Sequence, residues 1–377
     1  MAKYKLGEIC EIVSGSTPKT GIAEYWDGNL KWITPAEIDD ESYIITDSAR
    51  KLTELGVKKT GLSSFPSGTV ILSSRAPIGK VAIAGCEMYC NQGFKNLICS
   101  DRINNRYLYW FLKGNTAYLN SLGRGATFKE ISKKIVSDIE INVPEISQQL
   151  AAVDALERVS EIIRLRKNQL QKLDELIKAR FVEMFGDCKS RVSMNELCSI
   201  ITDGTHQPPR FQESGIPFIF VSNLVGNVVT YNAEKFISED TYAELYKRTP
   251  IEIGDLLLST VGSYGHPAVV TEDRKFLFQR HIAYLKPRHN MVNSFYLHSA
   301  LLAPDGQRQI EEKVKGIAQK TLNLSEIKKI VVPLPTIEEQ NQFEKFVNQT
   351  DKSKVAVQKS LDEAQLLFDS LMQQYFG

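Results

Sequence analysis

Two loops combine small, hydroxyl-bearing and basic residues in a pattern that could bind phosphate groups. The first loop spans residues 14–19 and the second spans residues 202–206. Glycine lets a backbone approach a phosphate closely, and hydroxyl and N–H groups can donate hydrogen bonds to it. A simple β-turn explains the same residues equally well. The candidate nucleic-acid contacts in these loops are Thr17, Lys19, Thr205 and His206.

Side chains suited to reading base edges occur at further positions. Glutamine and arginine can form bidentate hydrogen bonds to adenine and guanine. We align Gln92 with Gln279, one in each half of the chain. Any of these residues could equally be a solvated surface group. The other candidates of this kind are Arg75, Lys80, Lys95, Arg280 and His281.

A basic loop that contains glycine occurs twice. Residues 123–129 align with residues 314–320, and in both a glycine stands next to basic residues. Such a loop predicts a clamp on a phosphate backbone. Its candidate contacts are Arg124, Lys129, Lys315, Gln319 and Lys320.

Two carboxylates and a lysine beside the second basic loop could form a metal-dependent nuclease site. Asp305, Glu311 and Lys313 superficially follow the order of a PD-(D/E)xK signature. That chemistry requires the acids and the lysine on neighbouring strands around a metal ion. Here they fall on a predicted helix and loop, and the first half of the chain has no equivalent. A nuclease is therefore the less favoured alternative.

Other catalytic and metal-binding patterns do not occur in the sequence. We find no Asn/Asp-Pro-Pro-Tyr/Phe segment of adenine methyltransferases, no glycine-rich dinucleotide turn and no Gly-Lys-Ser/Thr phosphate loop. The five histidines show no metal-like spacing. Cys86 and Cys90 lack a second pair to complete a zinc site. We expect no metal site, no cofactor bound by this chain, and reduced thiols.

The composition is that of an ordinary globular protein. The chain has 377 residues, of which 42% are hydrophobic and 24% charged, with a net charge of +1. No apolar run reaches the roughly 18 residues that a membrane span requires, and the start of the chain lacks an apolar signal core. We expect a cytoplasmic protein. The low net charge counts mildly against nucleic-acid binding, although basic residues could still gather on one face.

The elements that position these side chains occur twice. Residues 123–186 match residues 314–377 at a constant offset of 191, so that Gln149 falls on Gln340 and Phe185 on Phe376. The earlier parts of the two halves also match, but their offset drifts between 186 and 188. A constant offset in one part and a drifting one in the other indicates a duplicated unit whose loops have changed length.

Each half ends in a long predicted helix. Residues 147–185 and 338–376 contain no glycine and no proline, and apolar residues recur every seven positions along them. This spacing favours an antiparallel coiled coil of the two helices, although they could instead pack only on their own globular parts. Thr336 and Glu339 form a predicted capping box at the second start. The predicted interface residues are Leu156, Ile163, Leu170, Ile177, Leu361, Phe368, Leu371 and Tyr375.

The globular parts are predicted to mix helices and strands, which gives an α+β fold class overall. In the first half we expect a helix at residues 104–113 and strands at residues 70–73, 80–84, 95–99 and 139–143. In the second half we expect strands at residues 255–258 and 283–285 and a helix at residues 294–302. The expected domains are residues 1–145 and 187–336 for the globular parts, and residues 146–186 and 337–377 for the helical regions.

Taken together, these features resemble the DNA specificity subunits of type I restriction–modification systems. The resemblance covers both halves of the chain. Its motifs are individually soft, but they occur in the same order twice. They are Leu6 to Cys10, Ser14 to Pro18, Trp32 to Pro35, Gly68 to Ser74, Val332 to Pro335 with Glu339-Gln340, and the terminal Phe-Gly of each helix.

The resemblance implies two target-recognition domains, each of which reads half of a bipartite DNA site. It also implies a non-catalytic chain that docks methyltransferase subunits, which methylate adenine with S-adenosylmethionine, and possibly motor-nuclease subunits. Since Thr202 to His206 differs from Ser14 to Pro18, we expect an asymmetric target. Two alternatives remain: the recognition subunit of a type II-like system with a fused methyltransferase–nuclease, and a coiled-coil scaffold that binds only protein.

Overall fold

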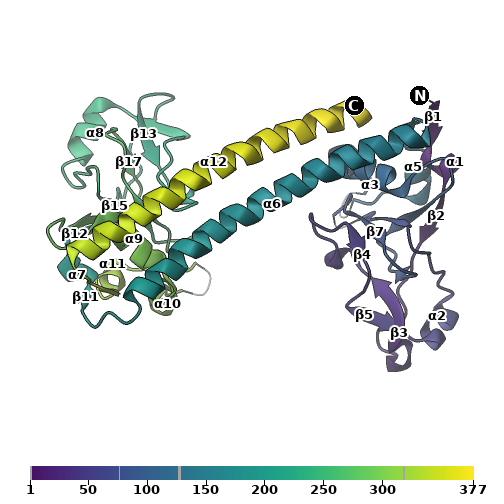
Figure 1. Ribbon diagram of the computed structural model, residues 1–377, viewed down its shortest axis with the longest axis horizontal. Coiled ribbons are helices and arrows are strands. Elements are labelled where there is room, and N and C mark those ends of the chain that lie inside the picture. The colour runs from purple at the N-terminus through teal and green to yellow at the C-terminus, as the bar shows by residue number, and fades with distance from the viewer. Residues whose placement is uncertain (1, 76, 126–128, 317–318) are drawn as a thin grey trace. The chain divides into compact units, whose positions relative to one another are not determined.

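The computed structural model describes residues 2–75, 77–125, 129–316 and 319–377. The chain forms two compact units. The first contains residues 1–166 and 360–377, and the second contains residues 167–359. Each unit therefore combines one globular part with portions of both long helices, α6 (Ile146–Phe185) and α12 (Ile337–Phe376) (Figure 1). Within the described residues, no helix is long and apolar enough to cross a membrane.

The globular part of the first unit is built on three sheets. The largest has the order β2 (Cys10–Ser14), β9 (Lys95–Cys99), β6 (Val70–Leu72), β7 (Val81–Ala84) and β4 (Ile44–Ile45). A smaller sheet has the order β5 (Arg50–Leu52), β3 (Trp26–Ile33) and β8 (Tyr89–Cys90). A third pairs β1 (Ala2–Lys5) with β10 (Glu140–Val143). The helices are α1 (Leu6–Ile9), α2 (Glu54–Thr60), α3 (Asn105–Gly114), α4 (Thr116–Ser121) and α5 (Lys133–Ser137), with 3₁₀ turns at Ala23–Tyr25 and Pro35–Glu37.

The second unit repeats this plan. Its largest sheet has the order β12 (Cys198–Asp203), β18 (Ile282–Pro287), β15 (Leu256–Ser259) and β16 (Pro267–Val269). The smaller sheet is β14 (Lys235–Ile237), β13 (Ile216–Ile219) and β17 (Leu277–Phe278), and β11 (Arg191–Ser193) pairs with β19 (Val331–Pro333). The helices are α7 (Met194–Leu197), α8 (Glu239–Leu245), α9 (Ser294–Leu302), α10 (Pro304–Lys313) and α11 (Leu324–Ile327), with a 3₁₀ turn at Val221–Leu224.

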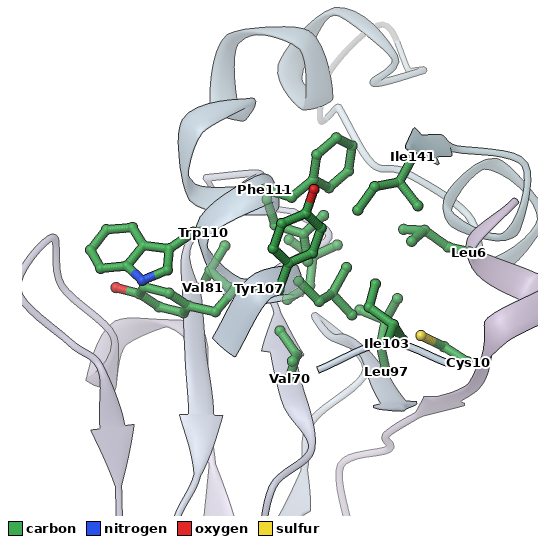
Figure 2. Close-up of a cluster of buried hydrophobic side chains, with 14 of the residues drawn as sticks. Leu6, Cys10, Val70, Val81, Leu97, Ile103, Tyr107, Trp110, Phe111 and Ile141 are labelled. Carbon is green, nitrogen blue, oxygen red and sulfur yellow. The ribbon is translucent and has the colours of Figure 1, made fainter. Parts of the chain in front are cut away.

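The main core of the first unit lies between the large sheet and α3. Leucine, isoleucine and valine side chains of the strands meet the apolar face of α3, where Tyr107, Trp110 and Phe111 are buried (Figure 2). The side chains of Phe368 and Phe376, near the end of α12, pack against the same cluster. The Tyr107 and Phe376 rings lie 4.9 Å apart. The end of one long helix therefore completes the core of this unit.

The core of the second unit is completed in the same way, but by the end of α6 instead of the end of α12. Tyr296 of α9 packs 5.1 Å from Phe185, near the end of α6. Because Phe185 and Phe376 stand at the matching offset of 191, the repeated Phe-Gly ends have a structural reason. In both units, the phenylalanine ring packs at an angle against a tyrosine. The hydroxyl of that tyrosine donates to a backbone carbonyl of the last strand, that of Asn142 or Pro333.

The start of each long helix is held by a buried glutamine. Gln149 is fully buried, and its Oε1 accepts a hydrogen bond of 2.8 Å from the backbone N–H of Asn104. Its Nε2 donates to the carbonyls of Arg102 and Pro144. Gln340, also fully buried, makes the same three contacts in the second unit, to Asn293, Met291 and Pro335. The predicted capping box of Thr336 and Glu339 is present beside it.

The two long helices also pack on each other, antiparallel. In the first unit, Val159 and Ile163 near the start of α6 contact Ala364 and Leu361 near the end of α12. In the second unit, Phe181 near the end of α6 contacts Phe343 near the start of α12, with ring centres 5.4 Å apart. The helices therefore pair, and the alternative that each packs only on its own globular part is wrong, since Phe185 of α6 lies in the core of the second unit.

The predicted interface residues follow this pairing. Leu156 and Ile163 are buried, and the other six are partly buried. Lys354, which interrupts the apolar seam, forms ion pairs with Asp174 at 2.6 Å and Asp351 at 3.0 Å. The charge at a seam position is therefore neutralised locally.

Replacing Gln149 with alanine should lower the free energy of unfolding by about 1–3 kcal/mol, because it leaves a buried N–H and two buried carbonyls without partners. Chemical denaturation measures this change. The matched control is Gln148→Ala, one residue earlier on the exposed side of the same helix turn. Equal stability of the two variants would show that the buried glutamine does not hold the helix start.

Candidate nucleic-acid interface

In the first unit, the predicted contact residues Thr17, Arg75, Gln92 and Arg124 lie on a set of backbone-linked turns that we call the turn array. It consists of Gly15–Thr17, Asn91–Gly93, Ser74–Arg75, Arg124 and Glu130–Ile131. Its turns are joined by backbone hydrogen bonds of 2.7–3.0 Å, from Ser16 to Cys90, Ser74 to Gly93, Ile131 to Ser74 and Arg124 to Glu130. The hydrogen bonds hold the loops in a fixed order, although the loops are far apart in the sequence.

The second unit has an equivalent turn array. It consists of Gly204–His206, Gln279–His281, Thr260–Val261, Lys315 and Lys320–Leu322. The corresponding hydrogen bonds run from Thr205 to Phe278, Thr260 to His281, Leu322 to Thr260 and Lys315 to Thr321, with lengths of 2.8–2.9 Å. Residues 126–128 and 317–318 of the two predicted basic loops lie outside the described residues.

The hydrogen bonds correct the alignment of the two halves by one residue. Ser16, not Thr17, occupies the place of Thr205, since each donates to the last residue of β8 or β17. Likewise Asn91, not Gln92, is the counterpart of Gln279, and Gln92 is the counterpart of Arg280. The chemical likeness of two glutamines made the alignment from sequence wrong here.

Glycine is required where the first turn crosses the neighbouring strand end. A Cβ atom on Gly15 would lie 2.0 Å from the carbonyl oxygen of Cys90. On Gly204 it would lie 2.3 Å from the carbonyl oxygen of Phe278. Both distances are far below van der Waals contact, so only glycine permits this backbone approach.

The candidate residues of the first unit differ in exposure. Lys19, Gln92, Arg124 and Lys129 are exposed, and Thr17, Arg75 and Lys80 are partly buried. The structure brings Thr17 and Gln92 together, since the hydroxyl of Thr17 donates to Gln92 Oε1. The ammonium group of Lys80 donates to the carbonyl of Pro35 over 3.0 Å.

Lys95 has an internal partner. It is 7% exposed, and its Nζ lies 3.3 Å from Ser74 Oγ and 3.4 Å from Glu130 Oε1. A buried ammonium group paired in this way ties the strand to the turn array. Its position gives Lys95 a structural role, with the side chain directed away from solvent.

In the second unit, the candidates surround two hollows. Arg280, His281 and Gln319 line one of about 280 Å³, and Thr205 and His206 line another of about 260 Å³. Lys315 lies 3.5 Å from Glu326, and Lys320 lies 3.0 Å from Glu311. The acidic partner of Lys320 is exposed, whereas that of Lys315 is partly buried, so a phosphate could replace Glu311 more readily.

Asp203 and Arg248 belong to this surface, although we did not identify them from the sequence. Asp203 Oδ2 lies 2.8 Å from His206 Nε2, and Asp203 Oδ1 accepts a hydrogen bond of 2.6 Å from Arg248. Arg248 lies 45 residues after Asp203, and only the folded chain brings the two side chains together. The pair fixes the side chains between the two hollows.

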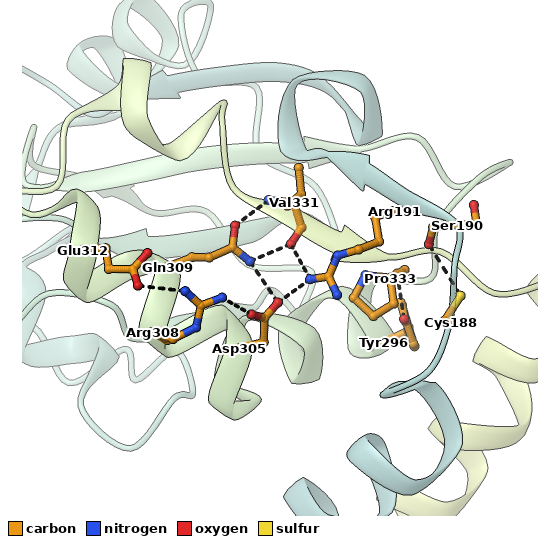
Figure 3. A network of polar contacts seen from close by, with 10 residues as sticks. All are labelled: Cys188, Ser190, Arg191, Tyr296, Asp305, Arg308, Gln309, Glu312, Val331 and Pro333. Atoms are coloured by element: carbon orange, nitrogen blue, oxygen red, sulfur yellow. Dashed lines mark hydrogen bonds and ion pairs between the residues drawn. The ribbon is translucent and has the colours of Figure 1, made fainter.

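The acidic residues of the weighed nuclease site are not arranged for that chemistry. Asp305, Glu311 and Lys313 all lie on α10 rather than on neighbouring strands. Asp305 is held by Arg191, Arg308 and Gln309 (Figure 3). Burial opposes ionisation of the Asp305 carboxyl group, but the contacts with Arg308 and Arg191 outweigh it and lower its pKa. Glu311 pairs with Lys320. In the described parts of the chain, no group of three or more His, Cys, Asp or Glu residues could hold a metal ion.

Comparison with known proteins gives consistent similarities. The profile of a family described as type I restriction modification DNA specificity domain matches residues 1–175 and 192–364. The MjaIX specificity subunit of a type I restriction enzyme from Methanocaldococcus jannaschii is 30% identical, over 96% of this chain and 90% of the relative. The EcoBI specificity subunit from Escherichia coli is 27% identical, over 72% of this chain and 64% of the relative.

Two solved structures share the fold. One comes from work on complex assembly and conformational transition of a type I R-M system. It has a TM-score of 0.62 and 19% sequence identity, and the match covers 100% of this chain and 97% of the chain in that structure. The other is the S subunit of a type I restriction–modification system from M. genitalium, with a TM-score of 0.54 at 15% identity, covering 100% and 96%. At these identities the likeness concerns the fold alone.

Substituting Gly15 with alanine should disrupt the first turn array, because the added methyl group would overlap a carbonyl oxygen. We expect a loss of about 1–3 kcal/mol in stability and weaker DNA binding by the assembled complex. Thermal unfolding and a binding titration measure the two effects. Gly21→Ala is the matched control, since its Cβ would meet nothing within 4 Å. Wild-type behaviour of the Gly15 variant would contradict the role of this backbone approach.

Proposed function

Because this chain belongs to the type I restriction–modification DNA specificity family, and is a DNA specificity subunit, we propose that its two domains read two different half-sites of one split DNA sequence. The observation that carries this proposal is the turn array. The two domains share its backbone hydrogen bonds but present different side chains on it, such as Gln92 against Arg280 and Gly93 against His281. Two arrays with the same backbone arrangement but different exposed side chains are suited to recognising two different base sequences.

The proposal includes a division of labour with partner subunits. This chain binds DNA, and a methyltransferase subunit supplies S-adenosylmethionine and methylates adenine. Motor-nuclease subunits would join the assembly for cleavage. The engagement of Asp305 and Glu311 in ion pairs supports a non-catalytic role for α10. The surface of this chain that faces DNA then supplies positioning and sequence choice.

The direct test is sequencing of N6-methyladenine in a host that carries this gene with its partner methyltransferase gene. We expect one methylated motif made of two unlike halves with a fixed gap. A palindromic or undivided motif would contradict the proposal. So would methylation by the purified chain alone in the presence of S-adenosylmethionine.

We further propose that the helix pair sets the gap between the half-sites. Inserting about four residues within Arg164–Lys178 should lengthen the tolerated gap, but it also shifts the apolar seam. A sharper design inserts seven residues after Leu170 and seven after Val357, which keeps the heptad register in both helices. Seven residues add about 10 Å, or roughly three base pairs of DNA.

The gap in the methylated motif of this insertion variant is the measurement. The control carries seven residues in the exposed loop at Gly226, where a Cβ would meet nothing within 4 Å, and it should keep the original gap. An unchanged gap in the helix variant, with methylation retained, would refute the proposal that the helices set the spacing.

A further inference from the structure

Gln92 and Arg280 occupy the same place in the two turn arrays. The residue before each of them donates its backbone N–H to the smaller sheet, over 3.2 Å in both domains. The residue after each of them accepts a backbone hydrogen bond from the turn that ends β6 or β15. The two positions are therefore anchored identically on both sides, and the side chain between the anchors is free to differ.

Both side chains are exposed and oriented by a neighbour. Gln92 Oε1 accepts a hydrogen bond from the hydroxyl of Thr17, which fixes the amide plane. The Nε of Arg280 lies 3.4 Å from Nε2 of His281 and donates toward it. Burial, together with the charge of Arg280, lowers the pKa of His281, so its imidazole is neutral near pH 7 and can accept this hydrogen bond.

The oriented groups have different base preferences. With its Nε engaged, the guanidinium of Arg280 presents its two terminal nitrogens, which match the two acceptors of guanine. The amide of Gln92 presents one donor and one acceptor, which match adenine. The carbonyl oxygen of Gln92 keeps a second lone pair beyond the hydrogen bond from Thr17, so the amide can still offer one acceptor and one donor to a base.

We propose, on the basis of the proposed reading of two half-sites, that this shared position determines one base pair in each half-site. Gln92 selects an adenine in the half-site of the first domain, and Arg280 selects a guanine in the half-site of the second. The position is thus a matched pair of specificity-determining residues. The neighbouring Thr17 and His281 position the two side chains.

An arginine on a basic surface can also contact a phosphate, which would carry no sequence information. Two substitutions separate these roles. Arg280→Gln removes both the positive charge and the planar pair of terminal N–H donors. Arg280→Lys keeps the charge and removes only the planar pair of donors. A phosphate contact would leave the motif unchanged with lysine, whereas a guanidinium contact to guanine would be weakened, because lysine lacks the planar pair of donors.

The experiment is sequencing of N6-methyladenine in a host that expresses the full chain with its methyltransferase partner. We expect both Arg280 variants to lose roughly tenfold or more of the preference for guanine at one base pair of one half-site, with the other half-site unchanged. Gln92→Arg should shift one base preference from adenine to guanine in the other half-site. Arg274→Gln, the same change on an exposed arginine outside the turn array, should leave the motif unaltered.

The outcomes discriminate clearly. A wild-type motif in the Arg280→Lys variant, or a uniform loss of methylation at all sequences, would overturn the inference and leave the split-site reading intact. An undivided wild-type motif would instead overturn the proposed function. Copurification with the methyltransferase and thermal unfolding establish that each variant is folded before its motif is compared.

Discussion

The structure depends on how each globular domain holds two helix ends at once. A buried glutamine, Gln149 or Gln340, ties the start of one long helix to the loop before α3 or α9. A tyrosine of α3 or α9, Tyr107 or Tyr296, packs on the phenylalanine at the end of the other long helix. Each long helix thus has three hydrogen bonds at its start and an aromatic contact at its end, so it cannot shift along its axis without leaving buried groups unpaired.

This constraint explains why the duplicated chain varies in some places and not in others. The helical parts keep a constant offset, since a single insertion would displace both anchors and the apolar seam between them. The exposed side chains of the turn arrays have no such restriction, because backbone hydrogen bonds join the turns and only Gly15 and Gly204 are fixed by the close backbone approach. Recognition can therefore change in one domain while the frame that presents it stays the same.

Much of the frame could be predicted from the sequence. The strand at Lys95–Cys99 and the helix at Ser294–Leu302 agree with the structure residue for residue, and both long helices agree to within one residue at their starts. Periodicity and capping are local signals, which explains this success. The site was less predictable because its geometry is not local. The burial of Lys95 depends on Glu130, and the equivalence of Gln92 with Arg280 is visible only in backbone hydrogen bonds.

The central claim is that two like frames grip two unlike stretches of the same DNA. Footprinting of the assembled complex on its methylated target tests it most directly, by comparing wild-type protein with a variant altered in one turn array. The account predicts two protected segments separated by a constant interval, with protection lost from only one segment when one array is disrupted. Simultaneous loss of both segments in a folded complex, or protection without any sequence preference, would contradict it.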